Sequence, residues 1–311
     1  MPKFSVVIPL YNKSNYIKKA IESVCAQSFE DFELVIVNDC STDNSLEIAK
    51  TYNDPRIRFL EHSENKGLSA SRNTGIKNTS AQYIAFLDAD DSWKPQFLEK
   101  INFLITEYKQ ADLFATNYEI SLQNGKYISH SFDITNQQPH SVVSNFFESN
   151  LAQTTYIPSG LCVNRRVFES IGLYNEAISY SEDVDFNIRA HSKFQMAYYN
   201  EAFVTYTLES ENQITQNSIK GKIIPDYDYF ENLFSERKDI KKYLDFQRYI
   251  KAKLFKLSRD KLTYNALVSK IDFNNLTGRQ KFLIRLPRPI LFGVTKIKLW
   301  LQRIGVEVNS Y

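Results

Sequence analysis

The stretch "FLDADDSW" places three carboxylates, Asp88, Asp90 and Asp91, within four positions directly after an apolar run. Asp88 and Asp90 are two residues apart in an extended segment, so their side chains can face the same way. Two carboxylates beside a diphosphate suit Mg²⁺ or Mn²⁺. We therefore predict a divalent cation that arrives with a phosphorylated substrate. The alternative is that Asp91 caps a helix beginning near Pro95 and that the other carboxylates are solvated.

A second acidic pair, Glu182 and Asp183 in "YSEDVDFNIRAH", lies where a loop becomes a helix. Acidic residues favour helix N-termini, so the pair could serve the helix alone. However, a hydroxyl that attacks an electrophilic carbon must lose its proton, and one carboxylate within hydrogen-bonding reach can accept it. The pair is therefore a candidate general base for a direct displacement.

Two further polar residues have more than one interpretation. Asp39 in "NDCSTDN" is either a turn residue or an acceptor for an N–H group of a nucleobase. Arg72 in "NKGLSASRNTGI" is a solvated helix residue, or it pairs with phosphate or with a neighbouring carboxylate. No glycine-rich phosphate loop follows the first apolar run. We assign no chemistry to the scattered histidines His62, His130, His140 and His191.

The elements that must position these side chains alternate regularly in the first 90 residues. Apolar runs at 4–9, 32–38, 57–61 and 83–87 are separated by helical patterns at 14–27, 42–52 and 68–78. This alternation predicts a doubly wound α/β fold with a parallel sheet. Ligands bind outside the carboxyl ends of such strands. Tyr11, Asp39 and the acidic stretch all follow strands, so we expect them along one rim.

Beyond residue 91 the pattern loosens. We predict a helix at 94–108, a strand at 112–120, a hairpin return at 123–132, and a loop at 133–158 with a short helix near 142–148. A helix at 166–171, a helix at 182–193 and a strand near 195–206 follow. We place a catalytic domain at 1–218, divided into a nucleotide-binding half (1–91) and an acceptor half (92–218), and a helical extension at 219–311.

The extension is strongly basic. Residues 241–311 hold 16 Lys/Arg against 4 Asp/Glu, whereas residues 1–240 hold 22 against 32. Near the end, one apolar stripe recurs at helical spacing with Trp300 close to it; it consists of Ile290, Val294, Ile297, Leu301 and Ile304. Such a helix could lie on an anionic membrane surface, or its stripe could pack on the catalytic domain or another subunit. Nucleic acid is not expected, because the aromatics are not interleaved as stacking platforms.

The amino-acid composition indicates the cellular compartment in which we expect the protein. Cys25, Cys40 and Cys162 are far apart and lack metal-type spacing, which favours a reducing compartment without disulfides or zinc. No stretch offers the 18 apolar residues that a membrane span needs. We expect the protein in the cytoplasm, either free or peripherally on the inner face of the plasma membrane.

Taken together, six segments resemble the family 2 glycosyltransferases, inverting enzymes with the GT-A fold. They occur in the family's order between residue 4 and about residue 190: "FSVVIPLYN", "ELVIVNDCSTDNS", "NKGLSASRNTGI", "YIAFLDADD", "RRVFESIGLYNE" and "SEDVDFNIR". The resemblance implies a GT-A type, doubly wound, mostly parallel sheet flanked by helices. It also implies transfer of a hexose or N-acetylhexosamine from a UDP-sugar to a hydroxyl of a glycan or lipid-linked acceptor in cell-envelope polysaccharide synthesis.

The family's site residues carry over by position. The resemblance implies donor contacts from Pro9, Tyr11, Asp39, Arg72, Asp88 and Ala89, with Asp39 facing the uracil. Asp90 matches the metal-binding carboxylate of the D-x-D motif, which implies Mn²⁺ or Mg²⁺. Asp183 matches the catalytic base. A homo-oligomer is compatible with this resemblance.

Two departures and two alternatives stay open. Many members carry an aspartate before position 39 and a glycine after it, where this chain has Asn38 and Cys40. Many also carry a histidine after the last strand, where "TYTLESENQIT" has none and Glu209 and Asn212 lie nearby. From the sheet and carboxylates alone, a nucleotidyltransferase or another sugar-nucleotide enzyme is an alternative. A non-catalytic, sugar-nucleotide-binding protein at a membrane is another.

Overall fold

The computed structural model describes residues 1–122, 125–129, 138–208, 210–211, 213 and 218–304. The chain divides into two compact units: Met1–Ser144 with Tyr156–Gln213, and Asn145–Thr155 with Ile214–Tyr311. The short segment Asn145–Thr155, which lies within the predicted catalytic domain, thus groups with the C-terminal helices. His130, Glu209 and Asn212 lie outside the described residues.

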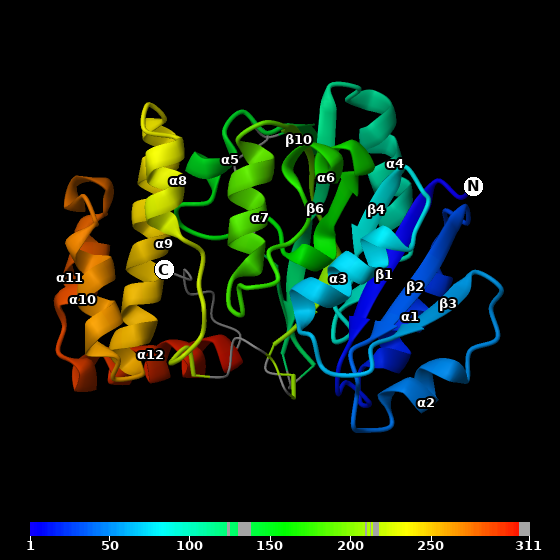
Figure 1. The fold of residues 1–311 in the computed structure, drawn as a ribbon, viewed down its shortest axis with the longest axis horizontal. Helices are drawn as coiled ribbons and strands as arrows, with labels where there is room; N and C mark the ends of the chain where they lie inside the picture. Colours follow the sequence, from blue (N-terminus) through cyan, green and yellow to red (C-terminus); the bar gives the residue numbers. More distant parts are fainter. Residues whose placement is uncertain (123–124, 130–137, 209, 212, 214–217, 305–311) are drawn as a thin grey trace. The chain divides into compact units, whose positions relative to one another are not determined.

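Within the described residues of the first unit, ten strands form one sheet (Figure 1). They are β1 (Phe4–Leu10), β2 (Phe32–Asn38), β3 (Ile57–Glu61), β4 (Tyr83–Phe86), β5 (Ser92–Trp93), β6 (Ala111–Ser121), β7 (Tyr127–Ser129), β8 (His140–Val142), β9 (Leu161–Asn164) and β10 (Gln195–Thr207). Their order is β3-β2-β1-β4-β9-β6-β10-β5, with β7 paired to β6 and β8 paired to β10.

The half of the sheet formed by β3, β2, β1 and β4 is parallel, as the alternating pattern predicts. Every residue of β1 is buried, which is typical of a parallel strand covered on both faces. The pairing of β1 with β4 stops early. The Leu87 N–H donates to the Val7 carbonyl, but Pro9 has no N–H to continue the ladder. The acidic stretch therefore leaves the sheet where the pairing ends.

The other half of the sheet is mixed. Strand β9 runs antiparallel to both β4 and β6, whereas β10 runs parallel to β6. The α/β class with helices around one sheet is confirmed. The predicted parallel pairing holds for the first half of the sheet and for β6 with β10, whereas β5, β7, β8 and β9 pair antiparallel with their neighbours. Residue patterns report burial and not strand direction, so the reversal at β9 could not be predicted.

Helices cover the sheet of the first unit: α1 (Ile17–Cys25), α2 (Ser45–Lys50), α3 (Leu68–Lys77), α4 (Phe97–Glu107), α6 (Arg165–Ile171) and α7 (Glu182–His191). Helix α3, which carries Arg72, packs against β1. The contact is close at Gly75, where an added Cβ would lie 2.3 Å from Val7 Cγ1. A glycine at this position lets α3 approach the central strand.

The second unit is helical, as predicted for the extension. Its elements are α5 (Phe146–Ser149), α8 (Tyr227–Leu233), α9 (Lys238–Leu257), α10 (Lys261–Ser269), α11 (Gly278–Arg285) and α12 (Arg288–Arg303). Each of the other helices contacts α9, whose buried Phe246, Tyr249 and Ile250 belong to the unit's apolar core. Among the described residues, no helix is long and apolar enough to span a membrane.

Candidate functional site

Among the described residues of the first unit, three that are not glycine have a backbone conformation that residues other than glycine rarely adopt. Asn12 after β1, Cys40 after β2 and Ser181 before α7 have φ values of 50°, 60° and 65°. Each adjoins a predicted site residue or pair: Tyr11, Asp39, and Glu182 with Asp183. Such strain concentrates at functional sites, where the surrounding structure holds it. The left-handed backbone at Cys40 also gives a physical reason for the glycine that many family members have there.

Asp39 is buried and its carboxylate accepts several hydrogen bonds. It accepts from the backbone N–H groups of Lys66 and Gly67, both at 2.8 Å, and from His62 Nδ1 at 2.7 Å. His62 in turn contacts Thr74 Oγ1 through Nε2. Asp39 therefore fixes the turn that leads into α3. Sequence reasoning missed His62 as its partner.

Asp91 does not cap a helix, so the alternative for this residue is wrong. The residues after it form β5, which pairs with β10, and α4 begins only at Phe97 without a side-chain cap. The buried Asp91 carboxylate accepts from Ser159 Oγ at 2.6 Å and from the Thr207 N–H at 3.0 Å. Burial, followed by the charges of Asp90 and Asp88, raises the pKa of Asp91 well above its usual value. Asp91 thus ties the acidic turn to β10.

Arg72 joins the two acidic segments. Its guanidinium is fully buried and donates to Asp88 Oδ1 at 2.9 Å and to Glu182 Oε1 at 2.7 Å. Burial lowers the pKa of Arg72, but the two carboxylates outweigh this effect and raise it. Of the alternatives for Arg72, the structure shows pairing with carboxylates. One positive charge therefore holds the two acidic segments together, and Arg72 lies 110 positions before Glu182 in the sequence.

Asp183 lies beside this bridge in the first turn of α7 and is half-buried. No described residue donates a hydrogen bond to its carboxylate, whereas the neighbouring Glu182 is held by Arg72. Burial and the charge of Asp183 raise the pKa of Glu182, with Arg72 opposing them. The two acidic residues thus differ: Glu182 is engaged in the fold, and the Asp183 carboxylate remains available to accept a proton.

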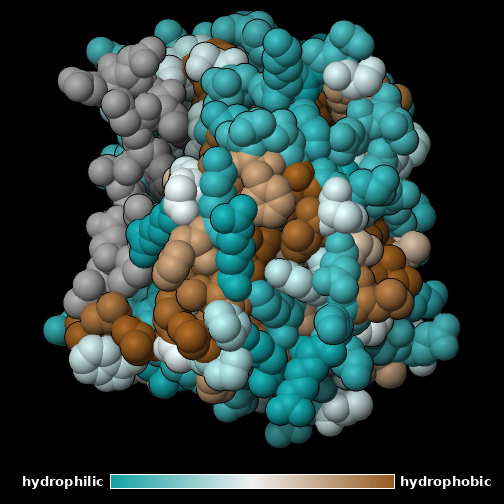
Figure 2. All heavy atoms as spheres, turned by 90° about the vertical axis from the view of Figure 1, so that its left-hand side faces the viewer, coloured by the Kyte–Doolittle hydropathy of each residue, from teal (hydrophilic) through white to brown (hydrophobic). Residues whose placement is uncertain are grey.

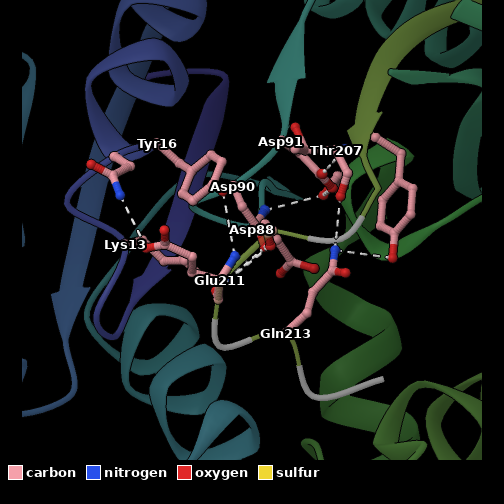
Figure 3. Close-up of polar contacts among 12 residues, drawn as sticks. Lys13, Tyr16, Asp88, Asp90, Asp91, Thr207, Glu211 and Gln213 are labelled. Atoms are coloured by element: carbon pink, nitrogen blue, oxygen red, sulfur yellow. Dashed lines mark hydrogen bonds and ion pairs between the residues drawn. The ribbon is translucent and has the colours of Figure 1, made fainter. Parts of the chain in front are cut away.

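The Asp90 carboxylate forms an ion pair with a lysine side chain, Lys13. The Lys13 ammonium lies 2.7 Å from Asp90 Oδ2, 3.1 Å from Ser210 Oγ and 2.6 Å from the Glu211 carbonyl oxygen (Figure 3). The Ser210 hydroxyl also donates to Asp90 Oδ2. Lys13 and Asp90 have side chains only 11% and 10% exposed. The loop after β1 and the segment after β10 therefore meet over the acidic turn.

The same segment has further anchors. The Asn15 amide donates to Glu211 Oε2 at 3.0 Å, and Gln213 donates to the Tyr206 hydroxyl at 3.1 Å and the Thr207 carbonyl at 2.8 Å. The sequence predicted the carboxylates of the acidic turn but not their contacts with Lys13 and with residues after β10.

The predicted donor contacts lie along the carboxyl ends of the strands. Pro9 and Ala89 are buried, Asp88 is bound by Arg72, and the Tyr11 ring is 41% exposed. A flat exposed ring beside the strand ends can stack on a nucleobase. The chain thus brings together the predicted residues of the acidic turn, Arg72 and α7, with Tyr11 and Asp39 on the neighbouring strand ends.

The acidic turn fits a divalent cation that arrives with a phosphorylated substrate. Among the described residues, no group of three or more His, Cys, Asp or Glu side chains is arranged to hold a metal ion. Mg²⁺, however, is often bound by one or two carboxylates and completed by substrate phosphates and water. Asp90 already faces the positive charge of Lys13, and Asp88 lies two residues away. These two carboxylates match that type of site.

Comparison with known proteins relates the chain to a protein family. The family model described as "Glycosyl transferase family 2" matches residues 5–172. The chain is 44% identical to glycosyltransferase GlyA of Streptococcus pneumoniae over 118 residues, which are 37% of this chain and 17% of GlyA. It is 39% identical to the putative teichuronic acid biosynthesis glycosyltransferase TuaG of Bacillus subtilis over 126 residues, 40% of this chain and 50% of TuaG. The chain thus matches half or less of the length of these relatives.

Among solved structures, TarS 1–349 of S. aureus in complex with UDP-GlcNAc superposes with a TM-score of 0.62. The alignment covers 98% of this chain and 92% of that chain at 17% sequence identity. At this identity, the likeness shows that the fold is shared.

Proposed function

Because the chain belongs to glycosyl transferase family 2, we propose that it transfers a sugar from a UDP-sugar to an acceptor hydroxyl, with inversion at the anomeric carbon. The observation that carries this proposal is the buried Arg72. It joins Asp88 of the acidic turn to Glu182, the residue before the free Asp183 carboxylate. A candidate donor-binding carboxylate and a candidate base are thereby fixed in one site.

The donor would lie along the strand ends. Tyr11 would stack on the uracil, and Asp39 would shape the pocket by holding the turn before α3. Asp90, with Asp88, would hold Mn²⁺ or Mg²⁺ against the diphosphate, and the cation would neutralise the charge of the departing UDP. Lys13 would then be released from Asp90 and would lie near the diphosphate as a second positive charge. TarS has been solved in complex with UDP and with UDP-GlcNAc, which supports a UDP-linked donor.

Asp183 would act as the general base. The acceptor oxygen forms a bond to the anomeric carbon while the bond between that carbon and the diphosphate oxygen breaks. The hydroxyl proton moves to the Asp183 carboxylate, and UDP leaves with the electron pair. Because the acceptor attacks from the face opposite the leaving group, one displacement inverts the anomeric configuration.

The acceptor in this proposal is a glycan or lipid-linked molecule of cell-envelope polysaccharide synthesis. The name of TuaG, which refers to teichuronic acid biosynthesis, supports this class. The sugar is a hexose or N-acetylhexosamine.

The test begins with protection against thermal unfolding by UDP-, GDP- and dTDP-sugars, which identifies the donor. UDP release is then measured with and without Mn²⁺ for the wild type, Asp183→Asn and Glu99→Gln. Glu99 lies in the first turn of α4 and serves as the matched control. We expect Mn²⁺-dependent release that falls about 10²- to 10⁴-fold in Asp183→Asn while donor protection persists. Release that is unchanged in this variant would remove Asp183 as the base, and donor binding without release would favour the non-catalytic alternative.

A further inference from the structure

Three cations gather on neighbouring helices of the second unit. Lys253 on α9, Arg279 on α11 and Lys298 on α12 lie on helices that pack together, since α11 and α12 both contact α9. Burial, followed by the charges of Lys298 and Arg279, lowers the pKa of Lys253 to about 8. Burial and Arg279 lower the pKa of Lys298 to about 8 as well. No described acidic residue forms an ion pair with Lys253 or Arg279. These like charges repel one another, and a bound anion would relieve the repulsion.

A hydrogen-bond donor without a partner lies beside the same cations. Tyr249 is fully buried, and its hydroxyl has no hydrogen-bond partner among the described residues. The Lys253 ammonium lies 4.4 Å from the centroid of the Tyr249 ring, and the charge of Arg279 acts on the hydroxyl. A buried donor that is left unpaired costs free energy, so a ligand that accepts from it is favoured.

An exposed apolar face adjoins the cluster. Helix α12 contacts α9 and buries Leu291, whereas six large apolar side chains of the helix and its end are 40% to 61% exposed: Ile290, Phe292, Val294, Ile297, Trp300 and Ile304. Figure 2 shows that apolar side chains form patches on this side of the molecule, with hydrophilic side chains between them. Lys298 follows Val294 by one helical turn and therefore lies at the edge of this face.

We propose that Lys253, Arg279 and Lys298 bind the phosphate headgroup of an anionic membrane lipid while the exposed side chains of α12 enter the acyl layer beside it. Charge complementarity identifies the headgroup, and the adjoining apolar face distinguishes a lipid from free phosphate. Residues 241–311 carry 16 basic against 4 acidic residues, so an anionic surface attracts this part of the chain. The inference does not depend on sugar transfer, since the helices would bind lipid with or without a donor.

The test measures binding of the full chain to phosphatidylcholine vesicles with and without phosphatidylglycerol, by sedimentation. The site variant is the double substitution Lys253→Gln/Lys298→Gln. The matched control is Lys242→Gln/Lys261→Gln, which removes the same charge from α9 and α10 of the same unit. We expect binding only with phosphatidylglycerol, weakened roughly 25-fold in the site variant, at about fivefold per cation, and less than threefold in the control. Equal losses in both variants would show a diffuse charge effect and would overturn the site.

A second variant separates the lipid from soluble anions. Ile297→Ser/Trp300→Ser keeps every cation but removes apolar area, and we expect roughly tenfold weaker vesicle binding. Unchanged binding would contradict insertion. Protection against thermal unfolding by millimolar inorganic phosphate equal to that by the vesicles would assign the site to a free anion. Because Arg279 is exposed, Arg279→Gln provides a substitution that should leave the fold intact; vesicle binding unaffected by it would also contradict the proposal.

Discussion

Among single residues, Arg72 is the most important for the acidic site, because its side chain holds the two acidic segments together. Its guanidinium donates to Asp88 and Glu182 from a fully buried position. Arg72→Met would leave both carboxylates without their cation, so we expect a loss of about 3–5 kcal/mol in unfolding free energy. Urea unfolding measures it. Arg58→Met removes a more exposed arginine paired with Glu33 and should cost less than about 1 kcal/mol. Equal costs would show that the bridge is unimportant.

Lys13 gives a second prediction at this scale. Its ammonium supplies the positive charge at Asp90 when no cation is bound, at an N–O distance of 2.7 Å. Lys13→Met should lower the unfolding free energy in metal-free buffer by roughly 1.5–3 kcal/mol, because a charged hydrogen-bonded pair is lost. It should also enlarge the rise in melting temperature that Mn²⁺ produces, because the cation no longer competes with the lysine. A smaller Mn²⁺ response than in the wild type would mean that Lys13 does not occupy the cation's position.

At the scale of elements, the site depends on how closely α3 approaches the sheet. A Cβ at Gly75 would lie 2.3 Å from Val7 Cγ1, so Gly75→Ala should force α3 away from β1 and displace Arg72. We expect a loss of about 1–3 kcal/mol in unfolding free energy and weaker donor binding. A Cβ added at Gly278 in α11 would meet no atom within 4 Å, so Gly278→Ala is the control and should leave both quantities nearly unchanged. A harmless Gly75→Ala would contradict the close packing.

Sequence patterns predicted most helices and strands of the first unit. They did not predict elements that form only because of tertiary contacts. The predicted runs at 32–38 and 57–61 coincide with β2 and β3: β2 is almost entirely buried, and the apolar residues of β3 are partly buried. The two-residue strand β5 was missed. It has no pattern of its own and exists because it pairs with β10.

The site shows the same division. The types and order of Asp88, Asp90 and Asp183 were readable along the chain. The pairing of Arg72 with Glu182 was not, because it joins positions 110 residues apart. Likewise, the contact between Lys13 and the segment after β10 depends on the fold bringing distant loops together.

Across the whole molecule, charge is unevenly distributed: the N-terminal part of the chain is acidic and the C-terminal part is basic. Residues 1–240 hold 22 basic and 32 acidic residues, and residues 241–311 hold 16 and 4. This distribution suits a protein whose C-terminal helices bind an anionic surface while its acidic part binds a cation-bearing donor.

The charges of Lys253 and Lys298 change near pH 8, so binding of the C-terminal helices to an anionic surface should depend on pH. The pKa values of Lys253 and Lys298 are lowered to about 8, so both side chains are mainly charged at pH 7 and mainly neutral at pH 9. Binding to vesicles that contain phosphatidylglycerol should therefore weaken over this range. The double variant Lys253→Gln/Lys298→Gln has lost these groups and should show a flatter profile. Parallel profiles for the two proteins would mean that other groups control the pH dependence.

In the proposed donor complex, Asp90 and a divalent cation hold the diphosphate. Titration calorimetry of UDP into the wild type and Asp90→Asn, each with and without Mn²⁺, measures the contribution of this contact. We predict that Mn²⁺ tightens UDP binding at least tenfold in the wild type and has little effect in Asp90→Asn. Equal Mn²⁺ enhancement in the two proteins would contradict the claim.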